Sequence, residues 1–170
     1  MKTISVKFAA MLTAVLLFSM NTGAVSATGA YTPVKPSKDT HAAYIDKLAL
    51  ANGKTVVVAD YIQWYEGASA DKVFLDREPD SGLEGAPDGY YIVNDNAKLR
   101  KLTVSPKAAV YMQIYNRTGN WEDADIVWNE KISLAAFKKL IAKDASLKDY
   151  PYHLVVKDGV VVKIIQQYIP

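Results

Sequence analysis

The sequence predicts an α+β domain, a mostly antiparallel curled sheet or small open β-barrel of about seven strands with one or two helices. Two dipeptides, Asn52-Gly53 and Asp158-Gly159, are typical of the tight turns of β-hairpins, and a segment rich in β-branched residues follows each of them. Further segments alternate apolar and polar residues, and only two segments combine helical spacing with a capping residue.

The first hairpin is expected from residues 43–51 and 55–59, on either side of Asn52-Gly53. Its second arm contains three consecutive valines, which favour a strand. The first arm leaves an alternative open, because alanine, leucine and lysine also favour a helix that Gly53 would end.

A short helix is expected over residues 69–77, with Ser69 as its N-cap and Asp71 in its first turn. Pro79 ends this helix, and the glycine-rich residues 80–89 form a loop. Two strands are expected next, over residues 89–94 and 99–104.

A strand over residues 110–115 has the clearest alternation, which places Val110, Met112 and Ile114 on one face and Tyr111, Gln113 and Tyr115 on the other. A short strand over residues 125–128 follows.

The best helix covers residues 133–143, capped by Ser133, with an apolar stripe along one side. Residues 152–157 and 160–168 form the second hairpin. Its second arm is apolar on both faces, which predicts a buried, central position.

The chain divides into three parts. Residues 1–27 match a cleavable secretory signal peptide, because Lys2 and Lys7 precede an apolar run that ends near the small residues Val25-Ser26-Ala27. The apolar run is short for a transmembrane helix, which needs roughly 20 residues. Residues 28–39 form a flexible, proline-containing leader, and residues 40–170 form a single domain. We therefore expect a secreted, extracellular protein with no membrane contact after cleavage.

Charge and cysteine content exclude several partners and chemistries. The chain has 20 Lys and Arg and 18 Asp and Glu, but two of the lysines lie in the signal peptide, so the mature chain is neutral. A neutral chain offers no electrostatic reason to bind nucleic acid. The absence of cysteine excludes disulfides, thiolate chemistry and lipid attachment at a cysteine, and it fits a Gram-positive bacterium.

Two segments carry a resemblance to a protein family. They are residues 89–96 (GYYIVNDN) with Leu99-Arg100, and residues 157–170, which begin KDGVV and end QYIP; Trp64 and Gly67 lie upstream. Together they resemble uncharacterised small exported proteins of Gram-positive bacteria, many of which are lipoproteins. The resemblance implies export and assigns no catalytic residue. Since this chain has no cysteine, it departs from the family's lipid attachment.

Most catalytic motifs are missing from the sequence. No HExxH, GxSxG, P-loop or GxGxxG segment is present. His41 is expected near the leader and His153 on a strand, without metal-ligand spacing, so both are interpreted as structural or solvated residues. A pair of carboxylates such as Glu84 and Asp88 could still hydrolyse a glycosidic bond. Whether the chain is an enzyme stays open, and a non-enzymatic role is favoured; no cofactor is expected other than calcium.

The acidic loop is one candidate site. Asp76, Glu78 and Asp80 alternate with other residues, and Asp88 follows; such oxygen ligands in a flexible loop are typical of calcium sites. The alternative is a solvated loop, since the glycine is displaced by one position and no glutamate follows at the twelfth position.

Aromatic residues form the second candidate site. Tyr111 and Tyr115 are expected on the strand face away from the core, and Trp64 and Trp121 lie near loops. Aromatic side chains give rigid binding surfaces, although they also pack in small cores. We therefore expect a non-catalytic binding or accessory domain for a cell-wall polymer, a protein or a peptide. Two alternatives remain, an inhibitor of an extracellular hydrolase and a small carboxylate-dependent hydrolase.

Overall fold

The computed structural model describes residues 31–118 and 124–169, and these form an α+β fold dominated by strands. The signal-peptide prediction and Trp121 lie outside the described residues. No helix among the described residues is both long and apolar enough to span a bilayer.

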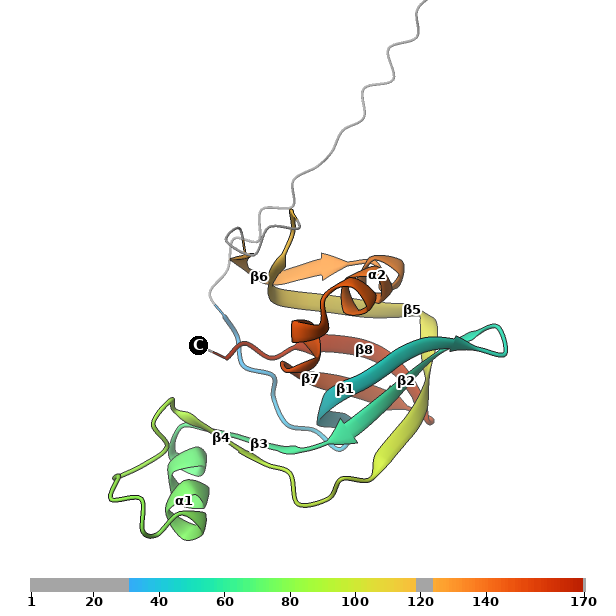
Figure 1. The fold of residues 1–170 in the computed structure, drawn as a ribbon. Helices are drawn as coiled ribbons and strands as arrows, with labels where there is room; N and C mark the ends of the chain where they lie inside the picture. Colours follow the sequence, from blue (N-terminus) through green and yellow to red (C-terminus); the bar gives the residue numbers. More distant parts are fainter. Residues whose placement is uncertain (1–30, 119–123, 170) are drawn as a thin grey trace, which may run out of the picture.

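A five-stranded mixed β-barrel is the centre of the fold (Figure 1). Its strands follow the order β2 (Lys54–Tyr61), β1 (Thr40–Ala51), β7 (Pro151–Lys157), β8 (Val160–Gln166) and β5 (Leu99–Asn116). Pairing of β2 with β5 closes the barrel, and β6 (Ala124–Ile132) extends the sheet beyond β5. The neighbours pair antiparallel except β5 and β8, which run parallel.

Both predicted hairpins are present. Asn52 and Gly53 have φ values of 49° and 74°, and Asp158 and Gly159 have 49° and 76°, so each turn places its two central residues in the left-handed region. The first arm of the first hairpin is therefore a strand, β1, and the helical alternative is wrong. The second arm of the second hairpin, β8, lies between β7 and β5, and Val161 and Ile164 are fully buried there.

A smaller unit is inserted between β2 and β5. It consists of the two-stranded ribbon β3 (Gln63–Glu66) and β4 (Tyr90–Val93) with helix α1 (Ala68–Arg77), and it projects from the barrel in Figure 1. Ala70, Phe74 and Ala86 form its own small core, with Tyr65 and Tyr91 packed against it.

Helix α2 (Leu134–Lys143) and the short 3-10 helix η2 (Ala145–Lys148) pack against the barrel interior. Phe137, Ile141 and Leu147 from these helices belong to the same buried cluster as Val57, Val110 and other barrel residues. Ser133 caps α2 as predicted, because its hydroxyl accepts a hydrogen bond from the Ala136 N–H.

Ser69 does not cap α1, contrary to the prediction. The helix begins earlier, with Gly67 at the N-cap, and the Ser69 hydroxyl donates to the Glu66 carbonyl. Gly67 has a φ of 53°, and its N–H donates to the Gly89 carbonyl, so the chain enters α1 directly from the β3–β4 ribbon.

Three strand boundaries also differ from the prediction. The strands expected over residues 99–104 and 110–115 are one continuous strand, β5, which pairs with β2, β8 and β6 along its length. The short strand expected over residues 125–128 extends to Ile132, and β3 was not predicted.

Candidate functional site

A hollow of about 230 Å³ lies on the outside of the barrel, beside β1 and β7. Both the segment before β1 and Trp64 of β3 contribute to its lining. The residues around this first hollow are Val34, Pro36, Thr40, His41, Ala42, Tyr61, Ile62, Trp64 and His153.

A second hollow of about 220 Å³ adjoins the first. It lies between the end of β2 and the segment that connects β4 to β5, and Asp95, Asn96 and Arg100 line it. Tyr61 and Ile62 line both hollows, so the two hollows meet at these residues. We call the two hollows together the Tyr61 cleft.

Tyr61 is held by a ring and a cation. The His41 ring stacks on it with centroids 4.8 Å apart and an angle of 11°, and the Arg100 guanidinium carbon lies 4.3 Å from its centroid. Burial raises the Tyr61 pKa and outweighs the lowering effect of Arg100, so the phenol stays neutral at physiological pH. Tyr61 therefore presents an uncharged ring, held by His41 and Arg100, to both hollows.

Trp64 is also fixed in orientation. Its indole stacks on Tyr90 with centroids 4.8 Å apart and an angle of 15°, and its Nε1 donates to Glu66 Oε1 at 2.8 Å. Tyr90 thus covers one face of the indole, and Trp64 also lines the first hollow. Because the indole is already ordered, less side-chain conformational entropy is lost when a ligand binds.

A polar network begins at His153, which lines the first hollow, and continues through Gln167. His153 Nε2 and Gln167 Oε1 are 2.8 Å apart, and Gln167 Nε2 donates to the hydroxyl of Tyr31 and to the Tyr168 carbonyl. Burial lowers the His153 pKa, which outweighs the raising effects of Gln167 and Glu66. Burial likewise raises the pKa of Tyr31 to about 12. Both groups are therefore neutral at physiological pH.

The segment that includes part of the predicted leader lies against the domain. The Tyr31 ring is 5.3 Å from the Trp128 ring and 6.1 Å from the Tyr168 ring, and Val34 and Pro36 border the first hollow. The leader thus contributes to the cleft.

The predicted aromatic residues do not form one site. Trp64 lies in the Tyr61 cleft, whereas Tyr111 and Tyr115 lie on β5, outside the residues that line the cleft. Tyr111 is half-buried, with the Lys163 ammonium 5.8 Å from its ring centroid.

Tyr115 is held by the barrel core and by two polar side chains. It is half-buried and packs against the barrel core, its hydroxyl donates to Glu130 Oε1 at 3.0 Å, and the Arg117 guanidinium carbon lies 4.3 Å from its ring centroid. Arg117 in turn forms a 2.6 Å ion pair with Glu130.

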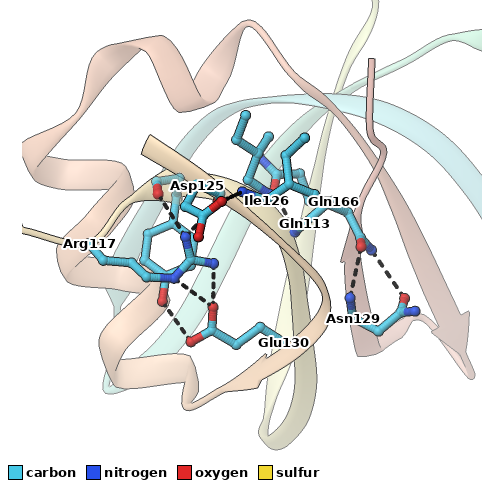
Figure 2. Close-up of polar contacts among 9 residues, drawn as sticks. Gln113, Arg117, Asp125, Ile126, Asn129, Glu130 and Gln166 are labelled. Carbon is cyan, nitrogen blue, oxygen red and sulfur yellow. Dashed lines mark hydrogen bonds and ion pairs between the residues drawn. The ribbon is translucent and has the colours of Figure 1, made fainter. Parts of the chain in front are cut away.

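The simple alternation predicted for β5 is wrong beyond Met112. The pairing of β5 with β6 shifts register between Met112 and Ile114, where Asn129 takes a φ of 54°. Gln113 is consequently 1% exposed; its side-chain oxygen accepts from the Asn129 N–H, and its Nε2 donates to Asn129 Oδ1 (Figure 2). Gln166 Oε1 accepts the backbone N–H groups of Gln113 and Ile114.

The acidic loop is exposed and separate from the cleft. Asp76, Glu78, Asp80 and Asp88 are all exposed, and Glu78 accepts a hydrogen bond from the Tyr91 hydroxyl. Among the described residues, no group of three or more His, Asp or Glu side chains is close enough to hold a metal ion. The calcium prediction thus gains no support from side-chain geometry.

Sequence reasoning missed His41, Tyr61, Arg100 and His153 as parts of the site. The two histidines lack the spacing of a metal-binding motif in the sequence, yet Ala42, beside His41, pairs with His153 across β1 and β7. Only the strand pairing of the barrel brings these residues to one hollow.

Comparisons with known proteins add no further evidence: no family model matches the chain, and no significant match is found among curated proteins or among solved structures.

Among the described residues, no carboxylate lines the first hollow, and Asp95, which lines the second, is paired with Arg77 at 2.5 Å. Glu84 and Asp88 are exposed, and no described residue bonds to their carboxylates. The described lining of the Tyr61 cleft therefore contains aromatic rings and a single carboxylate, that of Asp95.

Proposed function

We propose that this protein is a non-catalytic binding domain for an extracellular polymer, in the first place a cell-wall polymer, and that the Tyr61 cleft is its binding site. The observation that carries the proposal is the pair of adjoining hollows: Tyr61 lines both of them, and Trp64 lines the first. Each of these two rings stacks on a second ring, Tyr61 on His41 and Trp64 on Tyr90. Two hollows in a row suit successive units of a polymer better than one small molecule.

The extracellular setting is part of the proposal. The signal-like residues 1–27, the neutral mature chain and the absence of cysteine support it. The chain has no cysteine for disulfides. Its main hydrophobic cluster instead joins all five barrel strands and both of the helical segments that follow β6.

Sedimentation with insoluble cell walls tests the proposal. Residues 28–170 are incubated with purified Gram-positive peptidoglycan and pelleted. We expect the wild-type protein to pellet with the walls, and Trp64→Ala to weaken the apparent affinity at least tenfold, about 1.4 kcal/mol, because the cleft loses its fixed wall.

Tyr111→Ala is the matched control, since it removes an aromatic side chain from the barrel surface outside the cleft. It should pellet like the wild type. Melting temperatures show whether each variant is folded. Absence of wild-type pelleting, or equal loss in both folded variants, contradicts the proposed site.

A second candidate, an inhibitor of an extracellular hydrolase, is favoured by one loop. Leu83 is 49% exposed in the segment between α1 and β4, and the Ala86 N–H anchors this segment by donating to Asp71 Oδ1 at 3.0 Å. A rigid loop with an exposed apolar side chain is the geometry that an active-site inhibitor presents.

A panel of extracellular proteases and wall hydrolases tests this candidate. Inhibition by micromolar wild-type protein should be lost in Leu83→Asp and kept in Leu75→Asp, which alters an exposed leucine of α1 (41% exposed). If no enzyme in the panel is inhibited, or if both variants behave alike, the inhibitor function is rejected.

A further inference from the structure

The orientation of Gln167 determines which nitrogen of His153 carries a proton. Gln167 Nε2 lies 2.8 Å from the Tyr168 carbonyl and 3.3 Å from Glu66 Oε1, and both of these oxygens only accept hydrogen bonds. The amide oxygen of Gln167 must therefore be the atom that faces His153. Since this oxygen is also an acceptor, the proton lies on His153 Nε2, which donates to it at 2.8 Å.

The other ring nitrogen, Nδ1, is then an unprotonated acceptor. No described residue bonds to it, and it is not one of the fully buried side-chain atoms that lack a partner, which are Asp60 Oδ1 and Gln166 Nε2. His153 is 6% exposed and lines the first hollow, so the ring that carries this unpaired acceptor borders the hollow.

The groups around the imidazole keep it uncharged. Glu66 on β3 is the carboxylate whose charge raises the His153 pKa, and it already accepts hydrogen bonds from Trp64 Nε1 and Gln167 Nε2. Tyr31 before β1 and His41 on β1 are the titratable groups that approach from the other elements. Burial lowers the His153 pKa, which favours the neutral ring that accepts a hydrogen bond.

The first hollow combines apolar and aromatic side chains, among them Val34, Ile62 and Trp64, with the polar side chains of Thr40 and His41. Its volume of about 230 Å³ is below the roughly 300–1,000 Å³ of pockets for drug-sized ligands, so it suits a single ring-sized unit. A ring that fits must have an apolar face for the indole and a hydrogen-bond donor for Nδ1. A sugar ring has C–H faces and hydroxyl groups, and it needs no counter-charge.

We infer that the first hollow is a subsite for one uncharged, hydroxylated sugar ring of a glycan, which packs against Trp64 while one of its hydroxyl groups donates to His153 Nδ1. This inference rests on the proposed function and specifies the part of the polymer that is bound. His153 is a specificity-determining residue in this site, because a ligand without a donor leaves its buried acceptor unpaired.

Two substitutions separate the roles of the two nitrogens. The amide of His153→Gln can replace Nε2 and keep the bond to Gln167 but supplies no acceptor at Nδ1, whereas His153→Asn places its amide near Nδ1. Calorimetric titration with the tetrasaccharide of β-1,4-linked N-acetylglucosamine should show at least tenfold weaker binding for His153→Gln. His153→Asn should lie closer to the wild type.

The fully O-methylated tetrasaccharide, which lacks hydroxyl donors, should not bind. In the wild type, ¹⁵N NMR of the imidazole should show an Nε2–H tautomer whose Nδ1 resonance shifts when the tetrasaccharide is added. Equal affinity of wild type and folded His153→Gln, an unshifted Nδ1 resonance, or binding of the methylated sugar overturns the inference.

The outcomes also separate this inference from the proposed function. If walls are pelleted through the Tyr61 cleft but the tetrasaccharide does not bind, while a free wall peptide does, the binding function stands and the sugar subsite is wrong. If walls are not pelleted at all, the proposed function fails first.

Discussion

The buried imidazole of His153 makes the fold sensitive to acid. Its pKa in the folded protein is lower than the ordinary value of about 6.5, because burial disfavours the charged ring. Below pH 6.5 the unfolded chain takes up a proton that the folded chain does not, so the free energy of unfolding decreases as the pH falls. The slope for one such group is at most about 1.4 kcal/mol per pH unit.

Urea unfolding at pH 7.5 and pH 5.5 measures this effect. We expect the wild type to lose more stability than His153→Gln between the two pH values, because glutamine does not titrate. All carboxylates and His41 are common to both proteins and cancel in the comparison. An identical loss in the two proteins would show that His153 is not the group responsible.

At the scale of residues, Trp64 lines the first hollow, and its role in ligand binding stays a prediction. The prediction that Tyr115 points away from the core was wrong, because the irregular pairing near Gln113 cannot be seen in the alternation of β5. Nothing local marks this point, since the partner that resolves it, Gln166, is 53 residues away from Gln113.

At the scale of elements, the two predicted helix caps have different outcomes, and this difference can be measured. Ser133→Ala removes the acceptor for the Ala136 N–H and should lower the free energy of unfolding by about 1 kcal/mol. Ser69→Ala removes an exposed hydrogen bond inside the first turn of α1 and should lower it by only a few tenths of a kcal/mol.

Thermal and chemical denaturation of the two single variants tests this difference. The same substitution is made at the start of a helix in both cases, so each variant controls for the other. A larger loss for Ser69→Ala would contradict the capping assignment.

Elements with strong local signals were predicted well, and those without them were not. The two hairpins and α2 depend on turn dipeptides and on a capped apolar stripe, all of which lie within a few residues. Strand β3 has four residues and becomes a strand only through its pairing with β4, so sequence patterns do not reveal it. The continuous β5 was split because Ser105 and Pro106 interrupt its apolar pattern.

At the scale of the whole molecule, two separate cores predict two kinds of destabilisation. Phe137 is fully buried in the main cluster and meets the Tyr152 ring edge-on, with centroids 5.7 Å apart. Phe137→Ala should lower the global free energy of unfolding by about 3–5 kcal/mol. Phe74 belongs to the small core under α1, so Phe74→Ala should loosen mainly that unit.

Native-state hydrogen exchange distinguishes the two effects. Phe74→Ala should raise exchange in α1 and the β3–β4 ribbon while β1, β7 and β8 keep their protection. Phe137→Ala should raise exchange throughout the barrel. Equal loss of protection everywhere in both variants would show that the inserted unit and the barrel unfold together.

The fold class was predicted correctly from hairpin and helix signals, and the closure of the barrel was left open. Closure depends on β2–β5 pairing and on the parallel β5–β8 pair, which join segments that share no local pattern. The candidate site follows from this closure, because the Tyr61 cleft is built from the segment before β1, the two barrel hairpins and the inserted ribbon.

The parallel β5–β8 pair has a consequence for synthesis on the ribosome. Strand β8 follows every other barrel strand along the chain, yet it lies between β5 and β7. A nascent chain that stops before Val160 leaves the facing edges of β5 and β7 unpaired. The backbone N–H groups of Gln113 and Ile114 then also lack their acceptor, Gln166 Oε1. The barrel can therefore close only after β8 has been translated, and contacts between such distant segments form slowly.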